Sequence, residues 1–224
     1  GGTISIGGSC SSDNNTAVAD NMTVSFAALA DGPYSNCTIT VTDNASNTSD
    51  NLSVSSFTID TTAPKLEQVT AVSTPTNDNT SLSYTFSSTE AGTINYSVCS
   101  GSPDNASADN NTITFDALAD GTYSNCKISV DNNSNTSDNI SVREFRIDIT
   151  APTLDNVTIA SNNTLYTTMA KTGDNITLSI TSAEAIQTPS VSISGQAATV
   201  TGDNMTWSAA YTMASGDSEE LVSL

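Results

Sequence analysis

The heptapeptide "DGPYSNC" at residues 31–37 returns as "DGTYSNC" at residues 120–126. Asp-Gly is a strong turn signal, and the tyrosine after it is expected to begin a strand that also carries the cysteine. The flanks repeat as well: "NMTVSF" (21–26) corresponds to "NNTITF" (110–115), and "FTIDTTAP" (57–64) to "FRIDITAP" (145–152). The chain therefore contains a tandem repeat of about 88 residues, the size of one small β-domain.

Short alternating strands separated by turn clusters account for the whole repeat. In the second copy, alternation predicts the inward residues Ile113, Phe115, Ala117, Cys126, Ile128, Val130, Val142, Phe145 and Ile147. The alternation changes phase between Val142 and Phe145, which predicts a β-bulge. No window carries the apolar stripe of an amphipathic helix, so the sequence predicts an all-β fold of tandem sandwich domains.

Three domains follow from the repeat. Residues 1–63 form a repeat that lacks its first strands, residues 64–151 a complete repeat, and residues 152–224 a related domain of a second type that lacks its last strand. The expected core of the third domain is Val157, Ile159, Ile176, Leu178, Ile180, Val191, Ile193, Trp207 and Tyr211. We expect the missing strands to come from a longer array of which this chain is a window, or from strands donated head to tail between subunits.

The four cysteines fall into two pairs with equal spacing, one pair in each repeat. Cys10 and Cys37 are 27 residues apart, and so are Cys99 and Cys126. This spacing predicts one disulfide within each repeat, and therefore an oxidising compartment, with buried free thiols as the alternative.

Composition argues against several classes of function. The net charge is −19, with five basic residues against 24 acidic ones, so nucleic acid and anionic membrane surfaces are poor partners. Histidine is absent, which removes the commonest general base and metal ligand. The acids recur with the repeat, whereas one active site would not, and no nucleophile motif or phosphate-binding loop is present. We expect no enzymatic activity.

Asparagine is followed by Ser or Thr at the second position far more often than at the first. Seventeen of the 23 asparagines begin an N-x-S/T triplet, whereas only seven are followed directly by Ser or Thr. Strand alternation does not favour asparagine in particular, so the excess predicts N-glycosylation on outward-facing segments of an exported protein. The acceptor asparagines are Asn14, Asn21, Asn36, Asn44, Asn47, Asn51, Asn79, Asn95, Asn105, Asn110, Asn132, Asn135, Asn139, Asn156, Asn162, Asn175 and Asn204.

The repeat resembles the tandem immunoglobulin-like repeats of large microbial surface proteins. The resemblance rests on "EAGTI" (90–94), the D-G-x-Y-S-x-C phrase and the closing F-x-I-D-x-T-A-P, and it covers residues 1–152. The phrase is similar to a tyrosine corner followed by the second cysteine, although here the tyrosine precedes the cysteine by three residues rather than two. The resemblance implies immunoglobulin-like sandwiches in an elongated rod at the cell surface.

Calcium is the one metal for which the sequence offers candidate ligands. Asp60 and Asp148 lie in the two linkers, and Asp43 and Asp131 follow the cysteine-bearing strands. Carboxylate oxygens at a domain junction suit Ca²⁺, and linkers of similar repeat adhesins hold it. The alternative is that these aspartates cap turns while Pro64 and Pro152 fix the linkers.

The expected function is structural: a glycosylated extracellular rod that forms a filament, stalk or surface coat. The rival is an adhesin that binds a glycan or a protein through a tip outside this segment. An exposed aromatic cluster at a loop tip would favour the rival, but most aromatics occupy equivalent positions in the two repeats.

Overall fold

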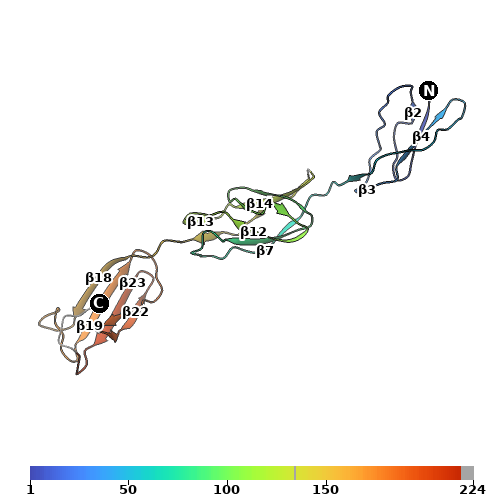
Figure 1. Ribbon diagram of the computed structural model, residues 1–224. Coiled ribbons are helices and arrows are strands. Elements are labelled where there is room, and N and C mark those ends of the chain that lie inside the picture. Colours follow the sequence, from blue (N-terminus) through green and yellow to red (C-terminus); the bar gives the residue numbers. More distant parts are fainter. Residues whose placement is uncertain (134, 218–224) are drawn as a thin grey trace. The chain divides into compact units, whose positions relative to one another are not determined.

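The computed structural model describes residues 1–133 and 135–217, and over these ranges the chain is all-β (Figure 1). The described residues form several small antiparallel sheets and contain no helix. No helix that could cross a membrane is therefore found in this part of the chain. The chain divides into two compact units, Gly1–Ile149 and Thr150–Leu224, and the first unit contains both repeats.

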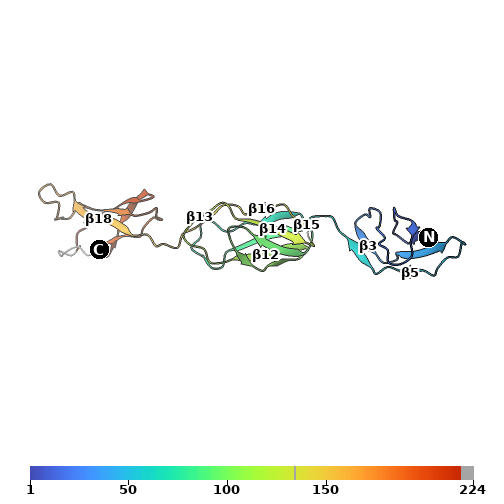
Figure 2. The same ribbon diagram turned by 90° about the horizontal axis from the view of Figure 1, so that it is seen from above.

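The second repeat has two larger sheets and one small one. β10 (Gly101–Ser102), β12 (Asp109–Phe115), β8 (Ser83–Ser88) and β7 (Leu66–Thr70) form the first sheet in that order. β11 (Asn105–Ala106), β9 (Gly92–Tyr96), β14 (Lys127–Asn132) and β15 (Asn135–Thr136) form the second, in which β16 (Ile140–Ser141) also pairs with β14. β13 (Gly121–Tyr123) pairs with β17 (Phe145–Ile147). β12 and β14 thus belong to the two different larger sheets of this repeat, which Figures 1 and 2 show from two directions.

The core of the second repeat lies between these sheets, where alternate residues of both meet. Ile113, Phe115, Cys126, Ile128, Val130, Val142, Phe145 and Ile147 are all buried there, as alternation predicts. Ala117 is exposed, because β12 ends at Phe115. Residues 142–144 belong to no strand. Before them, β16 pairs with β14 of one sheet, and after them, β17 pairs with β13 of another. The change of phase therefore marks a crossing between sheets rather than a bulge within one strand.

The first repeat keeps only part of this arrangement. β2 (Thr16–Ala17), β1 (Gly2–Gly7), β4 (Thr38–Asp43) and β5 (Leu52–Ser53) form one sheet, and β3 (Gly32–Tyr34) pairs with β6 (Phe57–Ile59). β1 and β4 correspond to β9 and β14, so residues 1–63 hold no counterpart of β7 and β8. Its buried apolar residues are Ile4, Cys10, Ala17 and Cys37, against fifteen in the core of the second repeat.

At two repeated positions, glycine permits a backbone conformation or a close approach of strands that a side chain would hinder. In the Asp-Gly phrase, Gly32 and Gly121 have φ of 141° and 153°, a region that side chains with a Cβ rarely adopt. At the start of β1 and β9, a Cβ on Gly2 or Gly92 would collide with the carbonyl oxygen of Thr42 or Asp131 on the neighbouring strand. These contacts explain why both copies carry glycine at this point.

The C-terminal domain is built on one four-stranded sheet. β18 (Leu154–Ser161), β19 (Asn175–Ser182), β23 (Thr206–Thr212) and β22 (Thr199–Asp203) lie side by side in that order (Figure 1). β20 (Ser192–Ile193) and β21 (Gln196–Ala197) make a separate small hairpin. The buried core consists of Ile176, Leu178, Ile180, Ile193, Trp207 and Ala209, with Val191 and Tyr211 packed against it.

For two residues of this domain, the prediction that they lie in the core is wrong. Val157 and Ile159 are 40% and 39% exposed, although each lies opposite a buried residue of β19, Ile180 and Leu178. β18 is an edge strand, and among the described residues little packs over its apolar side. Alternation identifies a shared face of a sheet, but a second layer is needed to bury that face. The segment "EELVSL", where a last strand was expected to be incomplete, lies outside the described residues.

Candidate functional site

The repeated phrase carries a disulfide and a tyrosine hydrogen bond in both copies. Cys10 is bonded to Cys37 and Cys99 to Cys126, with Cα atoms 5.4 and 5.3 Å apart. The hydroxyl of Tyr34 donates to the carbonyl of Ala30 at 2.9 Å, and that of Tyr123 to Ala119 at 3.0 Å. Each ring stacks on the phenylalanine of the closing strand, Phe57 or Phe145, with centroids 5.2 and 5.3 Å apart. The predicted disulfides are thus confirmed, and they are typical of an oxidising environment.

The aspartate of the phrase does more than make a turn, because its carboxylate binds the linker that leaves the repeat. Asp31 accepts hydrogen bonds from the amide and hydroxyl of Thr61, at 3.1 and 2.8 Å, and from the hydroxyl of Thr62 at 2.9 Å. In the second repeat, Asp120 accepts a 2.6 Å bond from the amide of Ile149, the counterpart of Thr61. We call these contacts the linker latches. The sequence signal was present, since both copies carry the aspartate, but only the fold brings the two segments together.

The latch in the first repeat also changes the chemistry of its carboxylate. Hydrogen bonds from the Thr61 side chain, the Thr62 side chain and the Thr61 amide lower the pKa of Asp31 below its usual value of 3.8. Donors that favour the charged form lower the pKa of an acid. The latch is therefore strongest when Asp31 is ionised.

A second group of polar contacts joins the first linker to the loops of the second repeat. The side-chain amide of Asn132 donates to Glu90 at 2.8 Å and to the Asp60 carboxylate at 3.4 Å. Asn135 donates its amide to the Asp60 carbonyl at 2.9 Å. Pro64, at the end of this linker, is buried. Two asparagines, one at the end of β14 and one at the start of β15, thus bind the linker that enters the repeat.

The four aspartates considered for calcium lie in different surroundings. Asp43 caps its own loop, accepting bonds from the amides of Ala45 and Asn47 at 2.8 and 2.9 Å. Asp131 accepts bonds from Asn95 and Thr136. Asp60 takes part in the linker contacts just described, and Asp148 forms a 2.8 Å ion pair with Arg146. Over residues 1–133 and 135–217, no three His, Cys, Asp or Glu side chains converge on a point where they could hold a metal ion.

The strand register corrects one correspondence on which the calcium hypothesis rested. Asp43 lies opposite Gly2, whereas Asp131 lies opposite Thr93, whose counterpart is Thr3. Asp43 therefore corresponds to Asn132, and Asp131 to Thr42. The two loops differ in length by one residue, so the carboxylates do not occupy equivalent places in the two repeats.

None of the seventeen acceptor asparagines is buried. Thirteen are exposed, and the four that are partly buried are Asn79, Asn132, Asn135 and Asn175. Two of these four, Asn132 and Asn135, bind Asp60 of the first linker through the amide nitrogen to which a glycan would be attached. Ser137, the hydroxyl residue of the Asn135 triplet, is itself buried. Access to the triplets is thus uneven across the chain.

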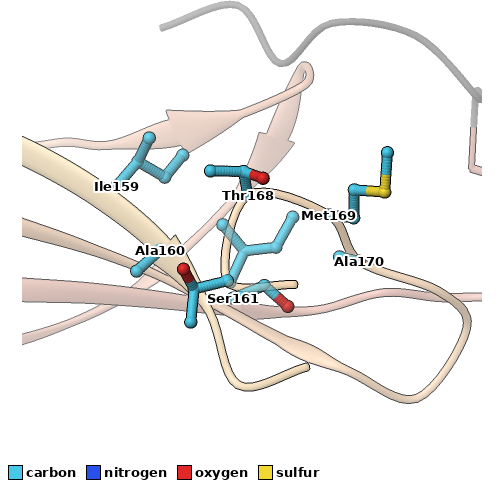
Figure 3. Close-up of a pocket in the computed structure, with 8 residues that line it drawn as sticks. Ile159, Ala160, Ser161, Thr168, Met169 and Ala170 are labelled. Carbon is cyan, nitrogen blue, oxygen red and sulfur yellow. The ribbon is translucent and has the colours of Figure 1, made fainter. Parts of the chain in front are cut away.

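An apolar hollow of about 240 Å³ lies beside the edge strand of the C-terminal domain (Figure 3). Ile159, Ala160 and Ser161 of β18 line one side, and Thr168, Met169 and Ala170 of the following loop line another. The loop also exposes Leu165 and Tyr166, which are 81% and 63% accessible. Sequence reasoning missed this feature, because it placed Ile159 in the core.

Comparison of the chain with models of known protein families found no match, and comparison with curated proteins found none either.

Proposed function

We propose that this chain is a structural, non-enzymatic part of an extracellular, N-glycosylated array of immunoglobulin-like domains, which forms an elongated filament, stalk or surface coat. The observation that carries the proposal is the pair of linker latches. The same carboxylate position, Asp31 in one repeat and Asp120 in the next, holds the start of the outgoing linker. A repeated contact at successive domain exits restricts the linkers, which is what a spacing element needs and a catalytic site does not.

Three further features support the immunoglobulin-like class. Each repeat combines a disulfide with a tyrosine whose hydroxyl bonds the backbone four residues upstream, and the second repeat packs two antiparallel sheets around them. The tyrosine bond and the two packed sheets are hallmarks of that class of sandwich. The fold class alone does not determine the function. The proposed role of the array is therefore inferred from the linkers, the acidic surface and the glycosylation triplets.

The surface location is supported by the disulfides and by the triplets. Disulfides persist in oxidising compartments, and the thirteen exposed acceptor asparagines lie where an attached glycan could project into solvent. Neighbouring repeats or subunits are the proposed partners, joined head to tail, with strand donation as one means of joining.

The proposal is tested on the native protein in two ways. Antibody labelling of unbroken cells should place the chain outside, in a filament or coat, and glycopeptide mass spectrometry should find glycans on many of the exposed asparagines. The four partly buried asparagines should show lower occupancy if glycans are added after folding. A chain found inside the cell, or unmodified at most triplets, would refute the proposal.

The exposed loop of the C-terminal domain favours a second candidate, a binding module or adhesin. Leu165, Tyr166 and Met169 expose apolar side chains beside the hollow, and exposed Tyr beside apolar residues is typical of binding surfaces. Replacing Leu165 and Tyr166 together by Ser should abolish adhesion to a glycan array or host surface under this hypothesis. Under the structural hypothesis, the double variant should assemble and adhere as the parent chain does.

A further inference from the structure

The first linker is held by two asparagines that lie opposite each other on neighbouring strands. Asn132 ends β14, Asn135 begins β15, and the two are directly paired in the register of these strands. Side chains that are directly opposite on antiparallel strands lie on the same face of the sheet. Both side-chain amides reach Asp60 of the linker, Asn132 at its carboxylate and Asn135 at its carbonyl. We call this pair of asparagines the amide clamp.

One peptide group of the linker is held from both repeats. The carbonyl of Asp60 accepts the 2.9 Å bond from Asn135, which belongs to the second repeat. The amide of Thr61 belongs to the same planar peptide group and donates at 3.1 Å to Asp31 of the first repeat. The clamp and the first linker latch therefore meet on a single rigid unit. Loss of the clamp would leave this unit fixed from the first repeat alone.

Asn132 uses both hydrogens of its side-chain amide in the clamp. It donates to the carboxylate of Glu90 at 2.8 Å and to that of Asp60 at 3.4 Å. The backbone of Glu90 is fixed in turn, because its carbonyl accepts a 2.6 Å bond from the hydroxyl of Ser88, which is buried. A primary amide has two hydrogens to donate. Asn132 therefore has none to give up without losing one of its two contacts.

The glycosylation triplet of Asn135 is closed in the folded chain. Its third residue, Ser137, is 6% exposed. The Ser137 hydroxyl accepts a bond from the Val130 amide at 2.9 Å and donates to the Asp138 carbonyl at 3.0 Å. The hydroxyl residue is part of the acceptor motif. A transferase that reads this triplet therefore has to meet it before the segment folds.

We propose that the amide clamp is controlled by glycosylation: without a sugar it fixes the first linker, and a sugar on Asn132 opens it. The transfer forms a bond from the anomeric carbon of a lipid-phosphate-linked sugar to the side-chain nitrogen of Asn132. The bond from that carbon to the phosphate oxygen breaks, its electron pair leaves with the phosphate, and the amide loses one proton. A modified Asn132 keeps one N–H for two acceptors, and the sugar adds bulk at the nitrogen that now contacts Asp60 and Glu90.

The state of the clamp is set once, when the second repeat folds. In the folded chain both clamp nitrogens donate hydrogen bonds and Ser137 is buried, so both triplets are shielded. The triplet of Asn139 lies close by in the sequence, but its asparagine is exposed. The share of chains modified at Asn132 before folding then determines the share of mobile linkers. This inference rests on the proposed function, because it gives two of the glycosylation triplets a role in the stiffness of the array.

The first test supplies an N-glycosyl transferase and a lipid-phosphate-linked sugar to the purified chain, once folded and once reduced and unfolded. Glycopeptide mass spectrometry then measures the occupancy of Asn132, Asn135 and Asn139. In the unfolded chain the three should be modified to similar extents. In the folded chain, occupancy of the two clamp asparagines relative to Asn139 should fall at least about tenfold, because transfer then needs local opening. Equal relative occupancy in the folded and unfolded chains would overturn the inference.

The second test measures the clamp in the chain without glycans. In Asn132→Asp a carboxylate replaces the donor and faces Asp60 and Glu90, so hydrogen exchange at the Thr61 amide should quicken several-fold. Asn139→Asp is the matched control, because it makes the same change at an exposed asparagine outside the clamp. Protection of the β14 amides in both variants reports that the repeat is folded. Equal exchange at Thr61 in the two variants would overturn the inference.

The third test compares the two glycosylated chains from the first test, after the unfolded one has been refolded by oxidation. The chain modified while folded carries sugars on its open triplets and should exchange at Thr61 as the unmodified chain does. The refolded chain also carries them on the clamp and should exchange as fast as Asn132→Asp. A Thr61 amide that stays protected in the refolded chain would show that the clamp tolerates the sugar, and would overturn the inference.

Failure here is distinct from failure of the proposed function. All three measurements use the purified chain and a supplied transferase, so they do not depend on where the native protein is found or on the glycans that it carries. Surface labelling and glycopeptides of the native protein test the proposed function without reference to the amide clamp.

Discussion

The carboxylate of Asp31 accepts a hydrogen bond from the backbone amide of Thr61, thirty residues further along the chain, at 3.1 Å. Asp31 begins the repeated heptapeptide, and Thr61 lies in the linker to the next repeat. The residue that appears in the sequence as half of a turn therefore also controls how the chain leaves the domain.

Removing this carboxylate should loosen the linker without unfolding the repeat. In Asp31→Ala, we expect hydrogen exchange at Thr61 to quicken several-fold, because its amide loses its acceptor. Asp50→Ala is the matched control, since it removes the same charge and the Asp50 carboxylate has no hydrogen-bond partner among the contacts found in the described residues. Equal exchange at Thr61 in the two variants would contradict the latch.

Acid should destabilise the chain. Hydrogen bonds to the carboxylates lower the pKa of Asp31, Asp43, Asp78 and Asp174 below the usual 3.8. The unfolded chain then binds protons at a higher pH than the folded chain does. The stabilisation is complete above the unfolded value and is lost as pH falls through the lower folded values. Thermal melting between pH 6 and pH 2 should show a midpoint that declines below about pH 4, and a flat profile there would contradict this.

Tyr84→Phe should stabilise the second repeat. The hydroxyl of Tyr84 is buried and has no hydrogen-bond partner within the described part of the chain. A buried polar group without a partner costs about 1–3 kcal/mol, so removing the oxygen should raise the free energy of unfolding by about 1 kcal/mol. Tyr96→Phe is the control with the opposite sign, because the Tyr96 hydroxyl donates to the Pro103 carbonyl at 2.7 Å. Chemical denaturation measures both, and destabilisation by Tyr84→Phe would show that its hydroxyl is satisfied.

Reducing the disulfides should affect the first repeat more than the second. Each bridge closes a sequence separation of 27 residues and contributes about 3–4 kcal/mol by restricting the unfolded chain. The first repeat buries four apolar residues, two of them the bridged cysteines, whereas the second has a core of fifteen. Under reductant, hydrogen exchange should therefore rise in residues 1–63 before residues 64–149. Simultaneous loss of protection would show that the repeats unfold as one unit.

Calcium removal should leave the melting midpoint unchanged. Asp43 and Asp131 already accept hydrogen bonds from neighbouring side chains or amides, and Asp148 pairs with Arg146. Thermal melting with a chelator and with added Ca²⁺ measures this directly. A midpoint that rises with Ca²⁺ would restore the calcium hypothesis, and Asp60→Asn would then show whether the first linker holds the ion.

Alternation along the chain identified the inward residues of the second repeat well. Ile113, Phe115 and Val130 are buried because two sheets meet over them. The same reasoning failed at Val157 and Ile159, which share a face with buried neighbours on β19 but lie on an edge that no second layer covers within the described residues. Periodicity reports which side chains share a face, and burial depends on what packs against it.

The sequence by itself determined the repeat, the all-β class and the disulfide pairing, because equal spacing in two copies constrains the partners without reference to space. The tertiary structure alone decided where Asp31, Asp60 and Asn132 act, because their partners lie 30 or more residues away along the chain. It also decided that equivalent residues of the two repeats differ in burial. Phe26 and Phe115 occupy the same position in the two copies, but only Phe115 is buried, since Tyr84 and Phe86 of β8 belong to the core around it.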